Sequence, residues 1–249
     1  MSQLIDKLKK LKPVRALVYM IVGSVSYPGL AIFNNLKIEG TEHIKDLPKK
    51  NVLFVSNHQT YFAEVITFLH IFCAVKWRKK NKLGIPYYLL NPFTGVFFVS
   101  AAETMKQNWL TRLFELAGAI TVRRIWNEGS KEVRKGLDPS DTRKIDRALK
   151  TSWIINFPQG TTQPFAEGRK GTVLLIKQNH PIVIPIVING FNNAFDKKGL
   201  KMIRKKTTLS VKFKPPLHID YNLDNDEILE TIMIAIEQSK SQQKSINLE

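Results

Sequence analysis

A histidine and a glutamate lie close together in the stretch of residues 51–64, NVLFVSNHQTYFAE. The apolar run 52–55 predicts a buried strand, and the longer apolar segment 65–75 predicts a helix. His58 would then lie where a strand ends and a helix begins, at the rim of a sheet, where α/β proteins place their chemistry. Glu64 could hold the imidazole in one tautomer and balance its charge after it takes a proton. The pair predicts a general base assisted by a carboxylate.

A second stretch favours a catalytic reading over a packed structural histidine, which is the commoner fate of a lone histidine after a strand. Residues 153–156, WIIN, predict another strand, and FPQGTT follows at 157–162. A Pro-x-Gly turn ends a strand abruptly and exposes backbone N–H groups and hydroxyls to a ligand. Two such loops at the rim of one sheet could face a single cleft.

Four stretches in order resemble the glycerolipid (lysophosphatidic acid-type) acyltransferase family. That family carries Asn-His, four residues and Asp; then Gly-x-Ile-x-x-x-Arg; then Phe-Pro-Glu-Gly-Thr-Arg-Ser; then a Pro-Ile-Val-Pro-Val-like strand. Here the stretches are NHQTYFAE (57–64), GAITVRR (118–124), FPQGTT (157–162) and PIVIPIV (181–187). The resemblance covers roughly residues 35–220.

The resemblance implies transfer of a fatty acyl group from a thioester donor, acyl-CoA or acyl carrier protein, to a hydroxyl of a lysophospholipid-like acceptor. The acceptor that fits best is 1-acylglycerol-3-phosphate. His58 would be the general base and Glu64 its carboxylate partner, with no metal and no cofactor required. The substrate-binding residues would be Asn57, Arg124, Gln159, Gly160, Thr161 and Lys170, with Arg169 as an alternative to Lys170.

Three positions depart from the family pattern. Ala63 stands where the family has Asp, and the carboxylate follows one place later as Glu64; on a helix one residue rotates a side chain by about 100°. Gln159 replaces the family's Glu, and Thr162 replaces its Arg. Both of these changes remove charge near the acceptor. They leave two alternatives open, a lyso-aminolipid acceptor or a non-catalytic lipid-binding relative.

The net charge of +17 predicts an anionic partner. Cations cluster at residues 7–15, 76–82 and 197–206. Nucleic-acid binders combine such charge with exposed aromatic residues or a recognised fold signature, and neither is evident, so the partner expected is a membrane surface with anionic lipid. The single cysteine, Cys73, excludes disulfides within the chain and Cys-based zinc sites.

The N-terminus favours membrane association. Residues 1–15 predict an amphipathic, basic surface helix, and residues 16–36 carry no charge. The pair Pro28-Gly29 predicts a break in this apolar segment. A single span would place the catalytic domain away from a cytoplasmic thioester donor, because the preceding cations keep the N-terminus inside. A monotopic arrangement on the cytoplasmic face is therefore expected, with a single span and a core-packing helix as alternatives.

The sequence as a whole predicts one α/β domain with a mostly parallel sheet and helices on both sides. The expected organisation is a membrane-associating segment at 1–36, an acyltransferase-like domain at 37–240 and a frayed polar tail at 241–249. The run 209–214 alternates in period two and predicts an edge strand. The aromatic stretch 83–100 could line an acyl-chain tunnel, and residues 127–141 predict a mobile loop.

Overall fold

The computed structural model describes residues 11–101, 109–122, 124–125, 136–137 and 139–246. Its centre is a seven-stranded sheet in the order β1-β9-β8-β2-β7-β3-β4. All neighbouring pairs are parallel except β8 and β9. The strands are β1 Asn35–Glu39, β2 Val52–Ser56, β3 Val96–Ala101, β4 Ala119–Val122, β7 Trp153–Asn156, β8 Ile182–Asn189 and β9 Thr208–Phe213. The predicted α/β fold with a mostly parallel sheet is confirmed.

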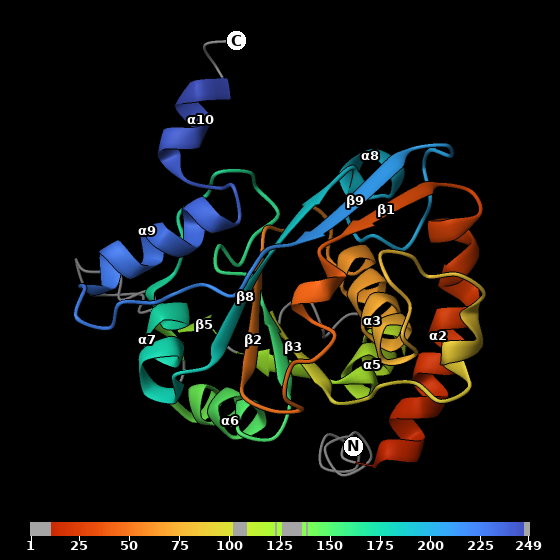
Figure 1. The fold of residues 1–249 in the computed structure, drawn as a ribbon, viewed down its shortest axis with the longest axis horizontal. Coiled ribbons are helices and arrows are strands. Elements are labelled where there is room, and N and C mark those ends of the chain that lie inside the picture. The colour runs from red at the N-terminus through yellow and green to blue at the C-terminus, as the bar shows by residue number, and fades with distance from the viewer. Residues whose placement is uncertain (1–10, 102–108, 123, 126–135, 138, 247–249) are drawn as a thin grey trace.

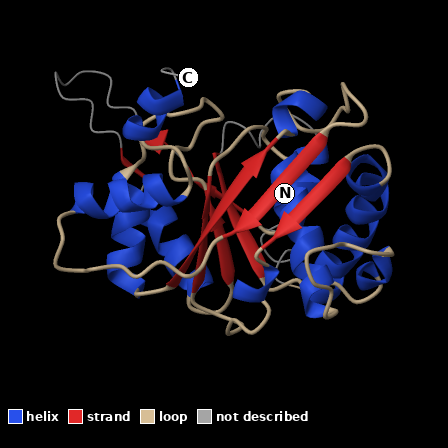
Figure 2. Cartoon of the chain, turned by 45° about the horizontal axis from the view of Figure 1, so that its top comes forward, coloured by secondary structure: helices blue, strands red, loops and turns tan. Residues whose placement is uncertain are grey.

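Helices cover both faces of the sheet (Figures 1 and 2). One face carries α2 Lys12–Ala31, α3 Ala63–Lys76, the short 3-10 helix η2 Pro86–Leu89 and α5 Trp109–Ala117. The other face carries α6 Pro139–Leu149, α7 Lys170–Asn179 and α9 Asn225–Ala235. The remaining elements are the short helices η1 Thr41–His43, α8 Phe191–Ala194 and α10 Lys240–Ile246, and a separate hairpin of β5 Arg124–Ile125 with β6 Gly136–Leu137.

The central strands are buried on both faces, as their continuous apolar runs predict. All five residues of β2 are buried, and so are the first three of β7. The pairing of β2 with β7 on one side and β8 on the other is in parallel register. The carboxyl ends of these three strands therefore open at the same edge of the sheet.

Strand β9 corrects one expectation. It is not an edge strand, because it lies between β8 and β1, and β1 forms the edge. Its residues nevertheless alternate between buried and exposed positions along the strand. The period-two pattern correctly indicates that only one face of this strand is covered. It does not indicate whether the strand lies at the edge of the sheet or inside it.

Helix α2 is not broken at Pro28-Gly29, which differs from the expectation. Pro28 lies inside a single continuous helix and does not divide it. Pro28 lies in the last turn of the helix. The backbone hydrogen bond that a proline cannot donate is therefore lost only near the end of the helix, and the helix continues to Ala31. At the other end of the chain, the segment expected to be a frayed tail forms α10, whose last residue is Ile246. The amphipathic helix expected over residues 1–15 lies almost wholly outside the described residues, and the loop expected at 127–141 lies largely outside them.

Helix α2 is long and apolar enough to cross a membrane by length and composition, yet one of its faces packs on the domain. Val18, Tyr19, Gly23 and Leu30 are buried against α3, α5 and η2. The opposite face exposes large apolar side chains: Leu17, Met20, Ile21 and Val25. In Figure 1 the helix lies along one side of the molecule and does not project from it.

A buried arginine fixes α2 to the sheet. Arg15 is only 5% exposed, and its guanidinium donates to the backbone carbonyls of Val96 and Ala117. The same group lies 4.2 Å from the ring centroid of Phe97. These contacts reach β3 and the end of α5, so the N-terminal helix is part of the domain's packing.

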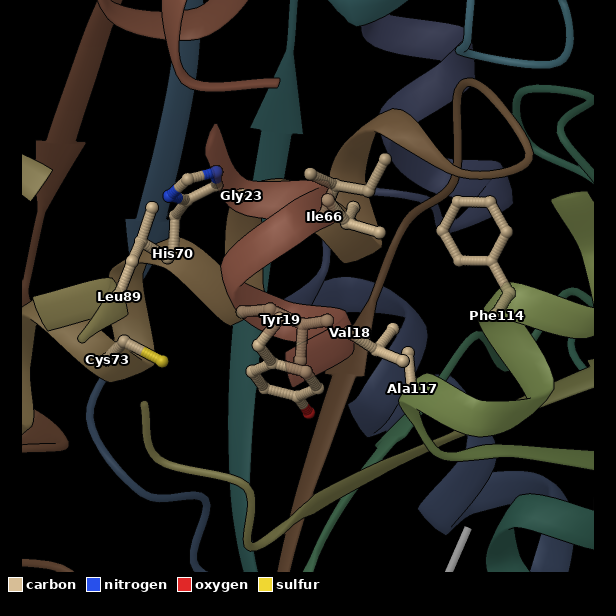
Figure 3. Close-up of a pocket in the computed structure, with 11 residues that line it drawn as sticks. Val18, Tyr19, Gly23, Ile66, His70, Cys73, Leu89, Phe114 and Ala117 are labelled. Atoms are coloured by element: carbon tan, nitrogen blue, oxygen red, sulfur yellow. The ribbon is translucent and has the colours of Figure 1, made fainter. Parts of the chain in front are cut away.

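The interior between α2, α3, α5 and η2 holds a small apolar cavity of about 20 Å³ (Figure 3). That volume has room for about one water molecule. Leu89 lines it from the aromatic stretch 83–100. The cavity is too small for an acyl chain, and the tunnel suggested for this stretch stays a prediction.

His70 lines the same cavity and is buried. Its two ring nitrogens lie 2.9 Å from the Ser26 hydroxyl and 2.9 Å from the Tyr88 hydroxyl. Burial lowers the pKa of His70 to about 4. The residue is therefore a neutral hydrogen-bonding link between α2, α3 and η2.

Candidate active site

The histidine at the end of β2 and the glutamate at the start of α3 come together. His58 Nδ1 lies 3.3 Å from Glu64 Oε1. The ring N–H is not aligned with the carboxylate well enough for a full hydrogen bond, and catalytic contacts of this kind often tighten only when substrate is bound. His58 keeps 13% of its side-chain surface exposed, whereas Glu64 is fully buried. With Nδ1 facing the acid, Nε2 is the ring nitrogen left for substrate.

The one-residue displacement of the carboxylate is absorbed by irregular backbone. Helix α3 begins only at Ala63, and its N-cap Phe62 has a non-helical conformation. Residues 57–62 therefore do not follow helical spacing, and the rotation expected for one residue of a helix does not apply. The extra methylene of Glu lets its carboxylate fold back toward His58 from the first turn.

Three hydrogen-bond donors hold the carboxylate. Glu64 Oε1 accepts from the backbone N–H groups of Gln59 at 2.6 Å and Thr60 at 2.5 Å, and Oε2 accepts from the Thr60 hydroxyl. Burial alone would raise the pKa of Glu64, but His58 and the Thr60 donors outweigh it and lower the pKa below its ordinary value. A buried carboxylate that stays ionised can stabilise an imidazolium beside it.

The turn after β7 meets His58 directly. The Phe157 ring stacks on the His58 ring with centroids 4.0 Å apart and planes inclined by 24°. The turn closes with a hydrogen bond of 2.9 Å from Gly160 N to Phe157 O. Because β2 and β7 are neighbouring parallel strands, the two loops leave the sheet side by side, as the sequence predicts.

Gly160 makes room for a cation beside this turn. Its φ is +61°, and a Cβ there would lie 2.8 Å from Arg169 Nε. Arg169 Nε also donates to the Gln159 carbonyl at 3.2 Å. The guanidinium therefore covers the bend, where its planar fork could bind a phosphate.

Lys170 points elsewhere. Its ammonium pairs with Asp226 of α9 at 2.8 Å. It lines a groove of about 330 Å³ between the 165–168 segment and helix α9. His58 is not part of that groove's lining. Of the two basic residues named from the sequence, Arg169 is the one that the structure places at the bend.

Asn57 and Gln59 tie the histidine loop to the end of β8 and the start of α8. Asn57 exchanges two hydrogen bonds with the backbone of Ile188, at 2.9 and 2.8 Å. Gln59 Oε1 accepts from Phe191 N at 2.9 Å. Asn57 is buried, and its amide positions the loop.

Gln159 is also turned inward. It is 3% exposed, and its Nε2 donates to the Ala166 carbonyl at 3.0 Å and to Gln238 Oε1 at 3.3 Å. The same Gln238 oxygen accepts from Phe165 N at 2.9 Å. A glutamine just beyond α9 therefore holds both ends of the segment that follows the turn.

Two further predicted residues lie at the same edge of the sheet. Thr161 is half-buried, and its hydroxyl accepts weakly from Gln163 N at 3.3 Å. Arg124 begins β5 just beyond the end of β4, but β3 and β7 lie between β4 and the strand that leads to His58. The side chain of Arg124 lies outside what the structure describes.

Sequence reasoning did not single out Phe157, Thr60 or Gln238. Phe157 was part of the quoted turn, but its stacking depends on the pairing of β2 with β7. Gln238 is far from the motif in sequence, and no local signal marks it. Within the described residues, no group of three or more His, Cys, Asp or Glu side chains could hold a metal ion.

These features define a class: an α/β domain that holds a histidine–carboxylate pair at the carboxyl edge of parallel strands. The family model described as Acyltransferase matches residues 35–189, more than half of the chain. All four sequence stretches noted above lie within that range. The chain belongs to the Acyltransferase family, which confirms the resemblance read from its motifs.

Among solved structures, the chain is similar to the crystal structure of the 1-acyl-sn-glycerophosphate (LPA) acyltransferase PlsC from Thermotoga maritima. The two share 17% sequence identity with a TM-score of 0.48, and the similarity covers 88% of this chain and 79% of that chain. No curated protein sequence matches this chain significantly.

Proposed function

We propose that this protein transfers an acyl group from a thioester, acyl-CoA or acyl carrier protein, to the hydroxyl of a lysophospholipid, with 1-acylglycerol-3-phosphate as the best acceptor. The single observation that carries the proposal is the His58–Glu64 contact of 3.3 Å beside the Phe157 turn. Membership of the Acyltransferase family supplies the reaction class.

In the proposed reaction His58 Nε2 takes the proton of the acceptor hydroxyl as its oxygen attacks the thioester carbonyl. The C–S bond breaks, and the imidazolium returns the proton to the leaving thiolate. Buried Glu64 stabilises the imidazolium in between. Only His58 and Glu64 take part in these proton transfers, and no step in this scheme uses a metal or cofactor.

Arg169 over Gly160 supports an acceptor with a phosphate. Its guanidinium adjoins the turn that stacks on the base, whereas Gln159, at the position of the family's glutamate, is used inside the fold. Arg124 is assigned a supporting role in drawing anionic substrate to this edge, whereas Lys170 is paired with Asp226 and is given no role there. Asn57 and Gly160 shape the site, and Thr161 could donate its hydroxyl to the acceptor.

The proposed location is the cytoplasmic face of a membrane with anionic lipid, in a monotopic arrangement. The packing of α2 along the domain and the buried Arg15 support a helix that lies in the membrane surface. A helix so fixed is poorly suited to crossing the bilayer alone.

The test combines purified protein, a long-chain acyl-CoA and 1-acylglycerol-3-phosphate, with release of free thiol and formation of phosphatidic acid as readouts. We expect His58→Ala to lose activity by about 10³-fold or more while its circular dichroism is unchanged. His180→Ala is the matched control, because His180 lies at the end of α7 and away from this edge.

Near-normal turnover by folded His58→Ala would overturn the general-base assignment. Turnover with a lyso-aminolipid but not with 1-acylglycerol-3-phosphate would replace the acceptor. An absence of thiol release with every lysolipid and both donor types would favour a non-catalytic lipid-binding relative.

A further inference from the structure

The loop of residues 196–206, between α8 and β9, contains one of the three cation clusters noted in the sequence. It carries six cations and one carboxylate: Lys197, Lys198, Lys201, Arg204, Lys205 and Lys206, with Asp196. The Asp196 carboxylate accepts hydrogen bonds within the loop, from the backbone N–H groups of Leu200 and Lys201 at 2.9 and 3.0 Å. The outward charge of this loop is therefore strongly positive.

Two large apolar side chains stand among these cations. Leu200 is 39% exposed and Ile203 is 59% exposed. The loop is folded, because Phe195 bridges to Met202 and Ile203 N donates to the Ala194 carbonyl at 2.8 Å. The fold thus exposes two apolar side chains that are flanked in sequence by cations. Apolar side chains can enter a bilayer interface while neighbouring cations bind anionic lipid head groups.

One end of the loop is joined to helix α2. Lys206 N donates to the Phe33 carbonyl at 2.7 Å, and Lys205 Nζ lies 4.9 Å from the centre of the Phe33 ring. Ile32 and Phe33 are themselves exposed. Figure 1 shows the loop beside the C-terminal end of α2. The apolar outer face of α2 therefore continues into this loop.

The tip of the loop is joined to the candidate active site. Tyr61 N and Phe62 N donate to the carbonyls of Lys197 and Lys198, both at 3.1 Å. Gly199 packs so closely that a Cβ would lie 2.4 Å from the Thr60 hydroxyl. Thr60 is the residue that donates to Glu64. The loop and the His58–Glu64 segment therefore form one packed unit.

We propose that residues 196–206 are a second membrane anchor, and that they seat the His58 edge of the sheet on an anionic bilayer. Leu200 and Ile203 enter the interface, and the surrounding cations bind lipid phosphates. An in-plane α2 alone would leave the domain free to turn about the helix axis. A second anchor away from that axis would prevent this rotation of the domain. The inference deepens the proposed function by giving the orientation of its site, but membrane seating can be measured without any turnover.

A solvent-sensitive label at Leu200→Cys tests the seating directly. Cys73 is buried and burial raises its pKa to about 12, so an introduced surface cysteine is the one that reacts. The matched position is Leu174→Cys on α7, which is exposed to a similar degree on the opposite side of the sheet. The full chain carries a nitrobenzoxadiazole label at either position and is mixed with vesicles of equal parts phosphatidylglycerol and phosphatidylcholine.

We expect label emission at position 200 to rise severalfold and shift to the blue when vesicles are added, and the emission at position 174 to stay unchanged. A label at position 200 that remains in water while the protein cosediments with the vesicles would overturn the proposal. So would a protein that does not bind these vesicles.

Charge removal gives a second measurement. Lys198→Gln with Lys201→Gln should weaken vesicle binding about 25-fold, since each cation near an anionic surface contributes about fivefold. The matched variant, Arg143→Gln with Arg147→Gln on α6, removes the same charge from the opposite side of the sheet and should have far less effect. Equal losses in both pairs would mean that net charge, and not this loop, drives binding.

Two controls separate the alternatives. Tighter binding to a DNA duplex than to the vesicles at the same salt, lost with the 198 and 201 substitutions, would assign the loop to nucleic acid and overturn a membrane anchor. His58→Ala should bind vesicles as the unchanged chain does. Failure of the acyl-transfer proposal would therefore leave this result intact, and failure of seating would leave turnover on soluble short-chain substrates intact.

Discussion

The His58 ring stacks on the Phe157 ring with centroids 4.0 Å apart, although the two residues follow different strands, β2 and β7. This contact joins the loop that carries the proposed base to the turn that is proposed to receive the acceptor. Loss of the stack should loosen the imidazole without removing it.

Phe157→Leu should lower kcat about threefold to tenfold, because an aromatic pair contributes about 0.5–1.5 kcal/mol beyond its buried area. KM should change little. The measurement is steady-state acyl transfer at saturating donor. Phe114→Leu is the matched control, since Phe114 stacks on Phe62 with centroids 4.2 Å apart inside the core. A larger loss of kcat in the control would contradict the role given to Phe157.

Glu64→Gln should lower kcat about 10²-fold or more, because an amide cannot balance an imidazolium as a carboxylate does. It should also destabilise the fold by about 2 kcal/mol, since the new amide N–H group would face donors where the carboxylate accepted. Turnover and urea unfolding measure the two effects separately. Thr60→Val removes one donor but keeps the acid, and its kcat should fall much less; the reverse order would place the acid outside the reaction.

The buried His70 predicts how stability depends on pH. Its pKa is about 4 when folded and about 6.5 when unfolded, so the unfolded chain binds the proton first as pH falls. The free energy of unfolding should therefore decrease by about 3 kcal/mol between pH 6.5 and pH 4. Denaturant unfolding across this range measures the slope. In His70→Gln that part of the slope should be absent, and an unchanged slope would refute the assignment.

Gln238→Leu should destabilise the segment that follows the Phe157 turn. The substitution leaves Phe165 N and the Gln159 amide without their shared acceptor, which costs about 1–3 kcal/mol for buried donors. We expect a lower Tm and a several-fold lower kcat, because the turn is less firmly held. Gln243→Leu in α10, where the side chain is exposed, is the control and should change neither. Equal behaviour of the two variants would show that the link does not matter to the turn.

Periodicity and turn chemistry predicted the main strands well. Val52 to Val55 and Ile182 to Ile188 are apolar without interruption, and both became central strands buried on two faces. Strand β3 was not predicted, because Pro92 and Gly95 precede it and its own burial is uneven. Local patterns also could not place β9 inside the sheet, since its neighbour β1 comes from a distant part of the chain.

The base and its acid were predicted from sequence, but their geometry was not. Helical spacing would have turned Glu64 away from His58, and only the irregular backbone before Ala63 brings them together. The inward direction of Gln159 was equally inaccessible, because its partner Gln238 follows α9 and depends on how that helix docks. Residue types therefore predicted the kind of reaction. Long-range packing determines which side chains point into the site.

Arg15 has a consequence for handling the protein. The guanidinium supplies donors to the carbonyls of Val96 and Ala117 from within α2, the one described helix that is long and apolar enough to cross a membrane. A shortened version lacking that helix, made to gain solubility, would uncover Ile66, Leu69 and Phe114 and leave two carbonyls without their donor. Detergent or lipid added to the whole polypeptide is the sounder route to purification.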